Sequence, residues 1–336
     1  MTRNSSVSIT AKAPRHHHSH KWVYWVLGFA LTATLIYLAR HVHEVGEFMH
    51  LVRGAKWSWL GIALVLQAGT YIAQGEIWWI IGRTAGKHLH RPLLYKLSLA
   101  KLFIDQALPS AGMSGTVVVA QALEREGLNR HAVRAGILIN TTSFFIAYVI
   151  SLLVALALVI YSGYDRSWIL WTTILFIVLG TGLTVGMFLL TGKRIAKVPE
   201  RFQHIKVVRE PMTLMQDADP KLVRNFRLQS ITTFYQLLTF ALDAVTLWVL
   251  IHSVYANGPI RNVFASFMIA NVLRTVSFIP GGLGTFEAAA VYMLSLNRIP
   301  VAVGLSAVLL FRGITFFLPM APGLWFSRHM TKKRDS

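Results

Sequence analysis

Residues 135–160 read AGILINTTSFFIAYVISLLVALALVI, a stretch without a charged side chain. An α-helix needs about 20 mostly apolar residues to cross the roughly 30 Å of hydrocarbon in a bilayer, so this stretch predicts a transmembrane helix. Five further stretches have the required length and at most one charge each, namely 22–39, 57–81, 168–192, 228–251 and 301–326. The sequence therefore predicts an all-α integral membrane protein with six transmembrane helices.

The overall composition agrees with this fold class. Of the 336 residues, 54% are hydrophobic and only 14% are charged, whereas about 25% charged residues are usual in soluble domains. The absence of cysteine excludes disulfide scaffolds, thiolate zinc sites and cysteine nucleophiles. The chain has no phosphate-binding Gly-Lys-Ser/Thr loop, no helical pair of metal ligands and no nucleophile elbow. We therefore expect no cofactor, no metal and no enzymatic activity.

Two further apolar regions are interrupted by proline and glycine. Residues 93–108 break at PSAGMSG (109–115) and resume over 116–123, and residues 262–279 break at PGGLG (280–284) and resume over 285–296. Eight to twelve helical residues rise about 12–18 Å, around half a bilayer. This favours two re-entrant hairpins over two pairs of kinked spans. The expected loop residues are Pro109, Gly112, Gly115, Pro280, Gly281, Gly282 and Gly284.

The basic residues predict the orientation. Six spans and two hairpins leave both termini on one side of the membrane, together with 82–92, 124–134 and 191–227, and that side receives 23 of the 33 Lys and Arg residues against six on the other. Cytoplasmic loops accumulate Lys and Arg, so we expect an inner (plasma) membrane protein with both termini in the cytoplasm. The net charge of +19 lies mostly in loops and tails, which does not favour nucleic acid as a partner.

The expected organisation is a basic cytoplasmic tail (1–21), which contains four histidines, a transmembrane domain (22–326) and a second tail (327–336). Within the transmembrane domain, residues 91–160 and 259–326 share one order: arm, Pro/Gly loop, half-helix, polar link and long helix. The predicted topology inverts the second repeat relative to the first. Inverted repeats with interrupted helices are typical of transporters that bind substrate near the bilayer midplane.

The segment IPGGLGTFE (279–287), followed by Val303-Gly304 and Arg312, resembles the transmembrane flippase-like domain of lysylphosphatidylglycerol synthases and their stand-alone relatives. LPSAGMSG (108–115) and EGL (126–128) agree with the first repeat, and the resemblance covers roughly 57–326. The resemblance implies a stand-alone member of the family that lacks the soluble aminoacyltransferase domain. Such a member would move a lipid between leaflets. Many relatives carry an acidic residue and an arginine just after the first loop, where this chain has MSGT (113–116).

Ionisable side chains inside a membrane are costly and usually face protein or water, so each is a candidate for the substrate path. Glu287 begins the second half-helix, where it either caps the helix or serves as a partner for a proton or a cationic headgroup. Arg312 lies near mid-span. It either pairs with Glu287 or binds a lipid phosphate through its bidentate fork.

The two arms that enter the hairpins each carry a basic residue. Arg274 lies one helical turn after Asn271 in the second arm, and Lys101 and Asp105 lie four residues apart in the first. The arms would bring positive charge towards the centre from both sides, as a path for an anionic headgroup requires. The alternative for Lys101 and Asp105 is a simple intrahelical ion pair.

Two spans carry polar stripes at helical spacing. The stripes are Gln236, Thr239, Asp243 and Thr246 on span 228–251, and Gln67, Thr70 and Gln74 on span 57–81. They either line a wet groove for a headgroup or form interhelical hydrogen bonds. Glu76 lies off the second stripe and near the cytoplasmic end of its span, so we expect it to snorkel to the interface.

The favoured function is translocation of a phospholipid or a modified lipid between leaflets, with anionic or aminoacylated phospholipids as partners. The alternative is a non-transporting partner or scaffold for a separate lipid-modifying enzyme, and a membrane-embedded enzyme is a third hypothesis. A separate lipid-modifying enzyme and further copies of the chain complete the candidate partners.

Overall fold

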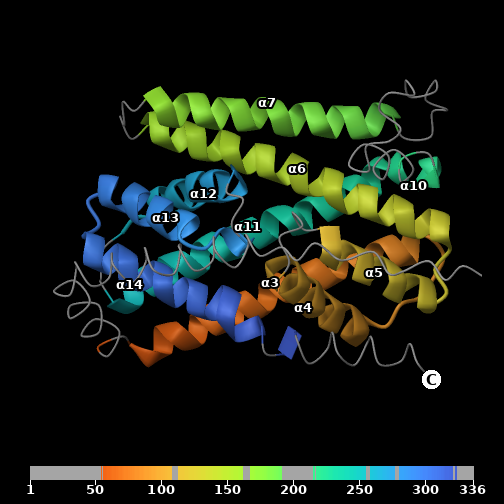
Figure 1. The fold of residues 1–336 in the computed structure, drawn as a ribbon, viewed down its shortest axis with the longest axis horizontal. Coiled ribbons are helices and arrows are strands. Elements are labelled where there is room, and N and C mark those ends of the chain that lie inside the picture. Colours follow the sequence, from red (N-terminus) through yellow and green to blue (C-terminus); the bar gives the residue numbers. More distant parts are fainter. Residues whose placement is uncertain are drawn as a thin grey trace, which may run out of the picture. The chain divides into compact units, whose positions relative to one another are not determined.

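A computed structural model describes residues 54, 56–107, 113–161, 167–190, 215, 217–254, 258–276, 280–320 and 322–323. Every regular element in these ranges is helical, as predicted (Figure 1). The elements are α3 (Trp57–Thr84), α4 (Arg91–Ala107), α5 (Met113–Arg125), α6 (Arg130–Tyr161), α7 (Ser167–Leu190), α10 (Pro220–Val223), α11 (Phe226–Val254), α12 (Ile260–Val276), η1 (Pro280–Gly282), α13 (Thr285–Leu296), α14 (Val301–Arg312) and η2 (Gly313–Phe317). The predicted span 22–39, the histidine cluster, Pro109, Gly112 and most of loop 191–227 lie outside the described residues.

Four helices are long and apolar enough to cross a membrane: Arg130–Tyr161, Leu170–Met187, Phe226–Val254 and Val301–Met320. Each coincides with a predicted span. Helix α3 has 28 residues, which rise about 42 Å, but its polar stripe makes it less apolar than these four. The total of six spans stays a prediction.

The outer surface of α7 has the character expected of a lipid-facing helix. Trp171, Leu175, Val178 and Leu179 are all more than half exposed. Such a continuous apolar face is unusual on a water-soluble monomer. In a bilayer it contacts acyl chains at no hydrophobic cost, which agrees with a membrane protein.

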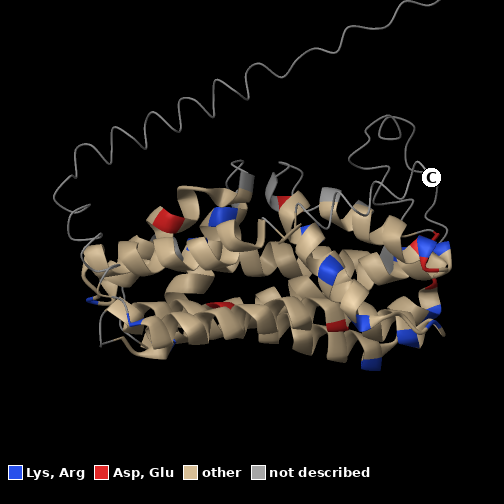
Figure 2. Ribbon diagram, turned by 90° about the horizontal axis from the view of Figure 1, so that it is seen from below, with Lys and Arg blue, Asp and Glu red and all other residues tan. Residues whose placement is uncertain are grey.

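The long helices run in alternating directions, so that chain connections gather at two opposite ends. The Lys56 amide at the start of α3 donates to the Ser253 carbonyl near the end of α11, at 3.1 Å. At the end where α3 ends and α6 and α11 begin, Lys and Arg are concentrated (Figure 2). This basic end carries Arg83, Lys87, Arg91, Arg125, Arg130, Arg134, Lys221, Arg224 and Arg227. The opposite end carries Lys56, Arg261 and Arg298 among the described residues.

The two interrupted regions form helical hairpins at these opposite ends. Helices α4 and α5 pack together at the basic end, and α12 and α13 pack together at the other (Figure 1). The first arm and its returning helix have 17 and 13 residues, and the second have 17 and 12. The turn η1 of the second hairpin contacts α4 of the first. The hairpins therefore start at opposite ends and meet between them.

Each hairpin is surrounded by its own apolar core. One core joins α12, α13 and α14 to α6 and α11, and contains the packed rings of Phe267, Phe286 and Phe311, whose centroids are 5.8–6.0 Å apart. The other joins α4 and α5 to α3, α6 and α10. This packing holds both hairpins against the long helices.

Gly115, in the first turn of α5, lets that helix approach α4 closely. An added Cβ would lie 2.5 Å from Asp105 Oδ1 and 2.6 Å from the Lys101 carbonyl oxygen. We expect Gly115→Ala to lower the free energy of unfolding by about 1–3 kcal/mol, as overpacking does, in thermal denaturation in detergent followed by circular dichroism. Gly61→Ala is the control, because no atom lies within 4 Å of its added Cβ. An unchanged midpoint for Gly115→Ala would contradict the close approach.

Candidate functional site

The second hairpin turns through backbone conformations that only glycine adopts easily. Gly281, Gly282 and Gly284 have φ values of +64°, +64° and +84°, in the left-handed region where a Cβ is strained. A Cβ on Gly282 would also overlap the side chain of Arg274. The PGGLG motif thus forms a tight turn, and its Gly282 leaves space for the side chain of Arg274 from the preceding helix.

Glu287 and Arg312 hold this turn through hydrogen bonds to its backbone. One carboxylate oxygen of Glu287 accepts a hydrogen bond from the Gly284 amide at 2.7 Å, and the other lies 2.7 Å from Arg312 Nε. Arg312 Nη2 donates to the carbonyl oxygens of Gly281 and Gly282, at 3.2 and 3.4 Å. The two side chains are only 13% and 5% exposed. We call the Glu287–Arg312 pair the loop clamp, and it combines the capping role and the ion pair considered from the sequence.

The surroundings of Arg312 restrict it further. Its guanidinium lies over the ring of Phe286, 4.5 Å from the centroid. It is the last residue of α14, directly before the π-helical turn η2. Because Nε and Nη2 are directed to Glu287 and to the loop carbonyls, Arg312 is held in place by the hairpin and is poorly placed to bind a mobile ligand.

Arg274 has a different environment. It lies near the end of α12, and its side chain is exposed. Within the described ranges no carboxylate lies within 4 Å of it, although it interacts electrostatically with Asp243 and Glu287 at longer range. Asn271, one turn earlier, is 5% exposed and donates to the Phe267 carbonyl of its own helix. Arg274 is therefore more accessible than Arg312.

The first hairpin has its own acid–base pair. Lys101 Nζ lies 2.6 Å from Asp105 Oδ2 on α4, and Asp105 Oδ1 accepts a hydrogen bond from the Gly115 amide at 2.9 Å. The pair is thus an intrahelical ion pair that also caps the returning helix α5. In both hairpins a carboxylate binds the amino end of the returning helix, where free amides and the helix dipole favour negative charge.

The polar stripe of α3 faces the polar stripe of α11, and the two are joined by hydrogen bonds. Gln74 Nε2 donates to Gln236 Oε1 at 3.0 Å and to Thr239 Oγ1 at 3.2 Å, and Thr70 Oγ1 donates to Asp243 Oδ1 at 3.4 Å. Gln236 Nε2 in turn donates to Asn140 Oδ1 of α6 at 3.1 Å, a partner that the apolar sequence around it did not point to. The interhelical hydrogen bonds expected as one alternative are therefore present. Asp243 is half-buried, and its carboxylate interacts electrostatically with Arg274 of α12.

Residues 25–323 match the family described as the lysylphosphatidylglycerol synthase TM region. The chain belongs to this family. No curated protein matches the chain. The family and the four apolar helices together establish a membrane protein of lipid metabolism or transport. The resemblance inferred from the PGGLG motif is thus confirmed.

The acidic and basic groups at the loop of the first hairpin come from the entering arm α4. The sequence MSGT (113–116) after the loop has no ionisable side chain, but Asp105 and Lys101 of α4 are brought to Gly115. Among the described residues no group of three or more His, Asp or Glu side chains is arranged to hold a metal ion. The two acid–base pairs at the hairpins are Lys101–Asp105 and Glu287–Arg312.

The prediction that Glu76 snorkels to the interface is wrong. Glu76 is only 7% exposed. Its Oε1 lies 3.0 Å from Arg91 Nε and accepts a hydrogen bond from the Tyr95 hydroxyl at 2.6 Å. Helix α4 folds back beside the end of α3 and covers this face. Arg91 also stacks on Trp79, 4.0 Å from the ring centroid. Glu76 therefore joins the first hairpin to α3.

We expect Glu76→Gln to weaken this joint. A hydrogen bond to a charged group contributes about 1.5–3 kcal/mol, and the exposure of Arg91 places the loss near the lower end, about 1.5 kcal/mol. The midpoint of thermal unfolding in detergent measures it. Glu126→Gln, which makes the same chemical change at an exposed position, is the control. Equal midpoints for both variants would show that the joint contributes nothing.

Proposed function

We propose that this protein moves phospholipid headgroups between the two leaflets at the junction of its hairpins and does no chemistry on them. The observation that carries the proposal is Arg274, an exposed arginine near the point where two hairpins from opposite ends meet. An arginine at membrane depth is costly, and such residues mark substrate or ion paths.

The hairpins support re-entrant geometry. Helices α5 and α13 have 13 and 12 residues and rise about 20 and 18 Å, too little to cross roughly 30 Å of hydrocarbon. Irregular backbone at that depth is stable only where protein or a wet cavity surrounds it. Two such hairpins from opposite sides are an inverted repeat, the architecture of many transporters. We place the basic end on the cytoplasmic side of the inner membrane, and the topology predicted from the sequence assigns both termini to the same side.

The side chains at the junction suit a phospholipid headgroup. A guanidinium binds phosphate oxygens through two parallel hydrogen bonds, and Arg274 is free of close carboxylates in the described ranges. Asp243 lies near enough to interact with Arg274 and would face the amino group of an aminoacylated headgroup. The acyl chains would stay in the bilayer, against exposed apolar faces such as that of α7.

Leaflet exchange by the purified protein tests the proposal. Proteoliposomes would contain a phospholipid with a headgroup fluorophore, and dithionite would bleach the outer leaflet at increasing times. We expect faster loss of the protected signal than in protein-free liposomes, with the mass spectrum of the lipids unchanged. Exchange at the protein-free rate, with a lipid-modifying enzyme bound to the purified protein, would replace transport with a scaffold role. A new lipid mass would make the protein an enzyme.

A further inference from the structure

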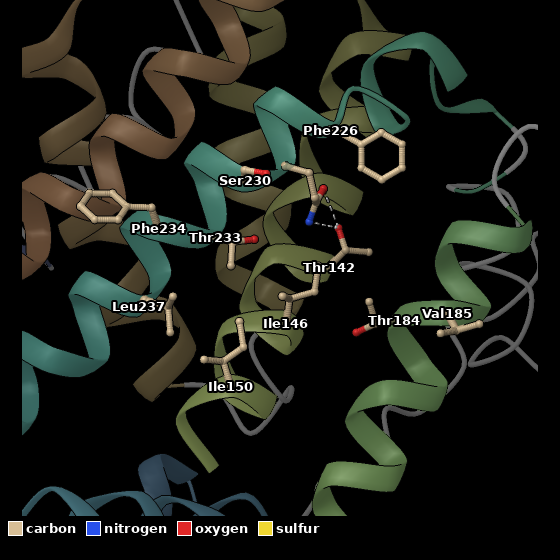
Figure 3. A pocket seen from close by; sticks show the side chains of 11 residues that line it. Thr142, Ile146, Ile150, Thr184, Val185, Phe226, Ser230, Thr233, Phe234 and Leu237 are labelled. Carbon is tan, nitrogen blue, oxygen red and sulfur yellow. Dashed lines mark hydrogen bonds between the residues drawn. The ribbon is translucent and has the colours of Figure 1, made fainter. Parts of the chain in front are cut away.

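A second site lies away from the hairpin junction, between α6, α7 and α11 (Figure 3). An open cavity of about 560 Å³ is formed there by eleven side chains. This volume is within the roughly 300–1,000 Å³ of typical ligand sites. We call this cavity the lateral groove. Its walls come from three of the four helices that are long and apolar enough to span a membrane.

The length and position of the lateral groove match one leaflet. On α11 it extends from Phe226 to Leu237, and the eleven helical steps between these residues rise about 17 Å. That is about half of the roughly 30 Å hydrocarbon thickness. Phe226 is the first residue of α11, so one end of the groove opens at the basic end of the protein. The groove therefore follows the leaflet on the basic side and ends near the midplane.

The lining is mainly apolar and includes hydroxyl-bearing side chains from all three helices. Ile146, Ile150 and Leu237 provide apolar walls, while Ser230 and Thr233 present hydroxyls from α11 (Figure 3). The polar atoms beneath are bonded within the protein, since Gln229 Nε2 donates to Thr142 Oγ1 and to Ser143 Oγ, both at 3.0 Å. Such a wall accepts a hydrocarbon chain along its length and offers donors to ester oxygens at the basic end.

The charge at the open end favours an anionic lipid. Arg227 follows Phe226 directly, and both are exposed. Arginine near a membrane surface attracts anionic lipids. We infer that the lateral groove holds one acyl chain of an anionic phospholipid of this leaflet, with its ester region beside Ser230 and Thr233 and its headgroup beside Arg227. This binding does not require that the protein moves any lipid.

Photolabelling of the whole protein tests the inference. Phosphatidylglycerol with a diazirine in one acyl chain, diluted into phosphatidylcholine liposomes that contain the protein, would be activated by light. Peptide mass spectrometry would then locate the adducts. We expect labelled residues over 142–150 and 226–237. Adducts spread along the outer face of α7, or confined to the hairpins, would overturn the inference.

Two variants sharpen the test. Ile146→Trp fills the groove and should remove the adducts over 226–237, whereas Leu175→Trp adds the same ring at a side chain 54% exposed on α7 and should leave them unchanged. Arg227→Gln should reduce the preference for labelled phosphatidylglycerol over labelled phosphatidylcholine by about fivefold. Unchanged labelling in Ile146→Trp, or an unchanged preference in Arg227→Gln, would contradict the assigned position of the lipid. The positions of the adducts in the unmodified protein test the inference even where a variant folds poorly. The labelling experiment does not depend on leaflet exchange.

Discussion

Arg312→Ala is expected to destabilise the protein by about 3–5 kcal/mol, the usual effect of removing one partner of a buried ion pair. The change leaves the Glu287 carboxylate without its cation, although that side chain is only 13% exposed. It also removes the donor to the carbonyl oxygens of Gly281 and Gly282. Thermal unfolding in detergent, followed by circular dichroism, measures the loss.

The control for this experiment is Arg298→Ala, an exposed arginine between α13 and α14, which should leave the midpoint unchanged. Glu287→Gln should cost less than Arg312→Ala, because a glutamine oxygen still accepts from the Gly284 amide. The double variant that combines Arg312→Met with Glu287→Leu should lose less stability than the sum of the two single variants. Each single variant leaves one unpaired buried charge, whereas the double variant leaves none. Normal unfolding of Arg312→Ala with complete loss of leaflet exchange would instead assign Arg312 to the substrate.

Local patterns in the sequence predicted much of the fold. The proline and glycine interruptions located both hairpins, and the family resemblance came from the same residues. The spacing of Gln67, Thr70 and Gln74 on one helix, and of Gln236, Thr239 and Asp243 on another, placed each set on one face, and the structure brings these faces together. Periodicity within a helix determines which residues share a face, so these predictions needed no knowledge of neighbours.

The predictions that depended on neighbouring helices were less successful. Glu76 was expected at the interface because its helix alone shows no partner for it, yet α4 brings Arg91 and Tyr95 to its carboxylate. In the same way, the sequence did not distinguish Arg312 from Arg274 as the accessible arginine. That difference arises because α14 directs Arg312 into the clamp, while α12 leaves Arg274 exposed beside Gly282. Tertiary packing, which no single helix encodes, decides such cases.

Arg274→Gln is expected to reduce leaflet exchange by about tenfold or more while leaving the unfolding midpoint unchanged. A charge-assisted hydrogen bond contributes about 1.5–3 kcal/mol, which corresponds to at least about tenfold. Glutamine keeps the Cβ and Cγ methylene groups of Arg274 that lie against Gly282, so we expect the packing of the hairpin turn to be preserved. The dithionite assay in proteoliposomes gives the exchange rate.

Two matched variants separate the headgroup role of Arg274 from a general effect of charge. Arg261→Gln makes the same change on the same helix, but at the opposite end from Arg274, where Arg261 lies 5.8 Å from the ring centroid of Tyr161, and should leave exchange unchanged. Arg274→Lys retains the charge without the planar fork, so its rate should be intermediate. If Arg274→Gln and Arg261→Gln slow exchange equally, the effect comes from net charge and the headgroup does not bind Arg274. If Arg274→Lys is fully active, a positive charge is sufficient and bidentate recognition of the phosphate is excluded.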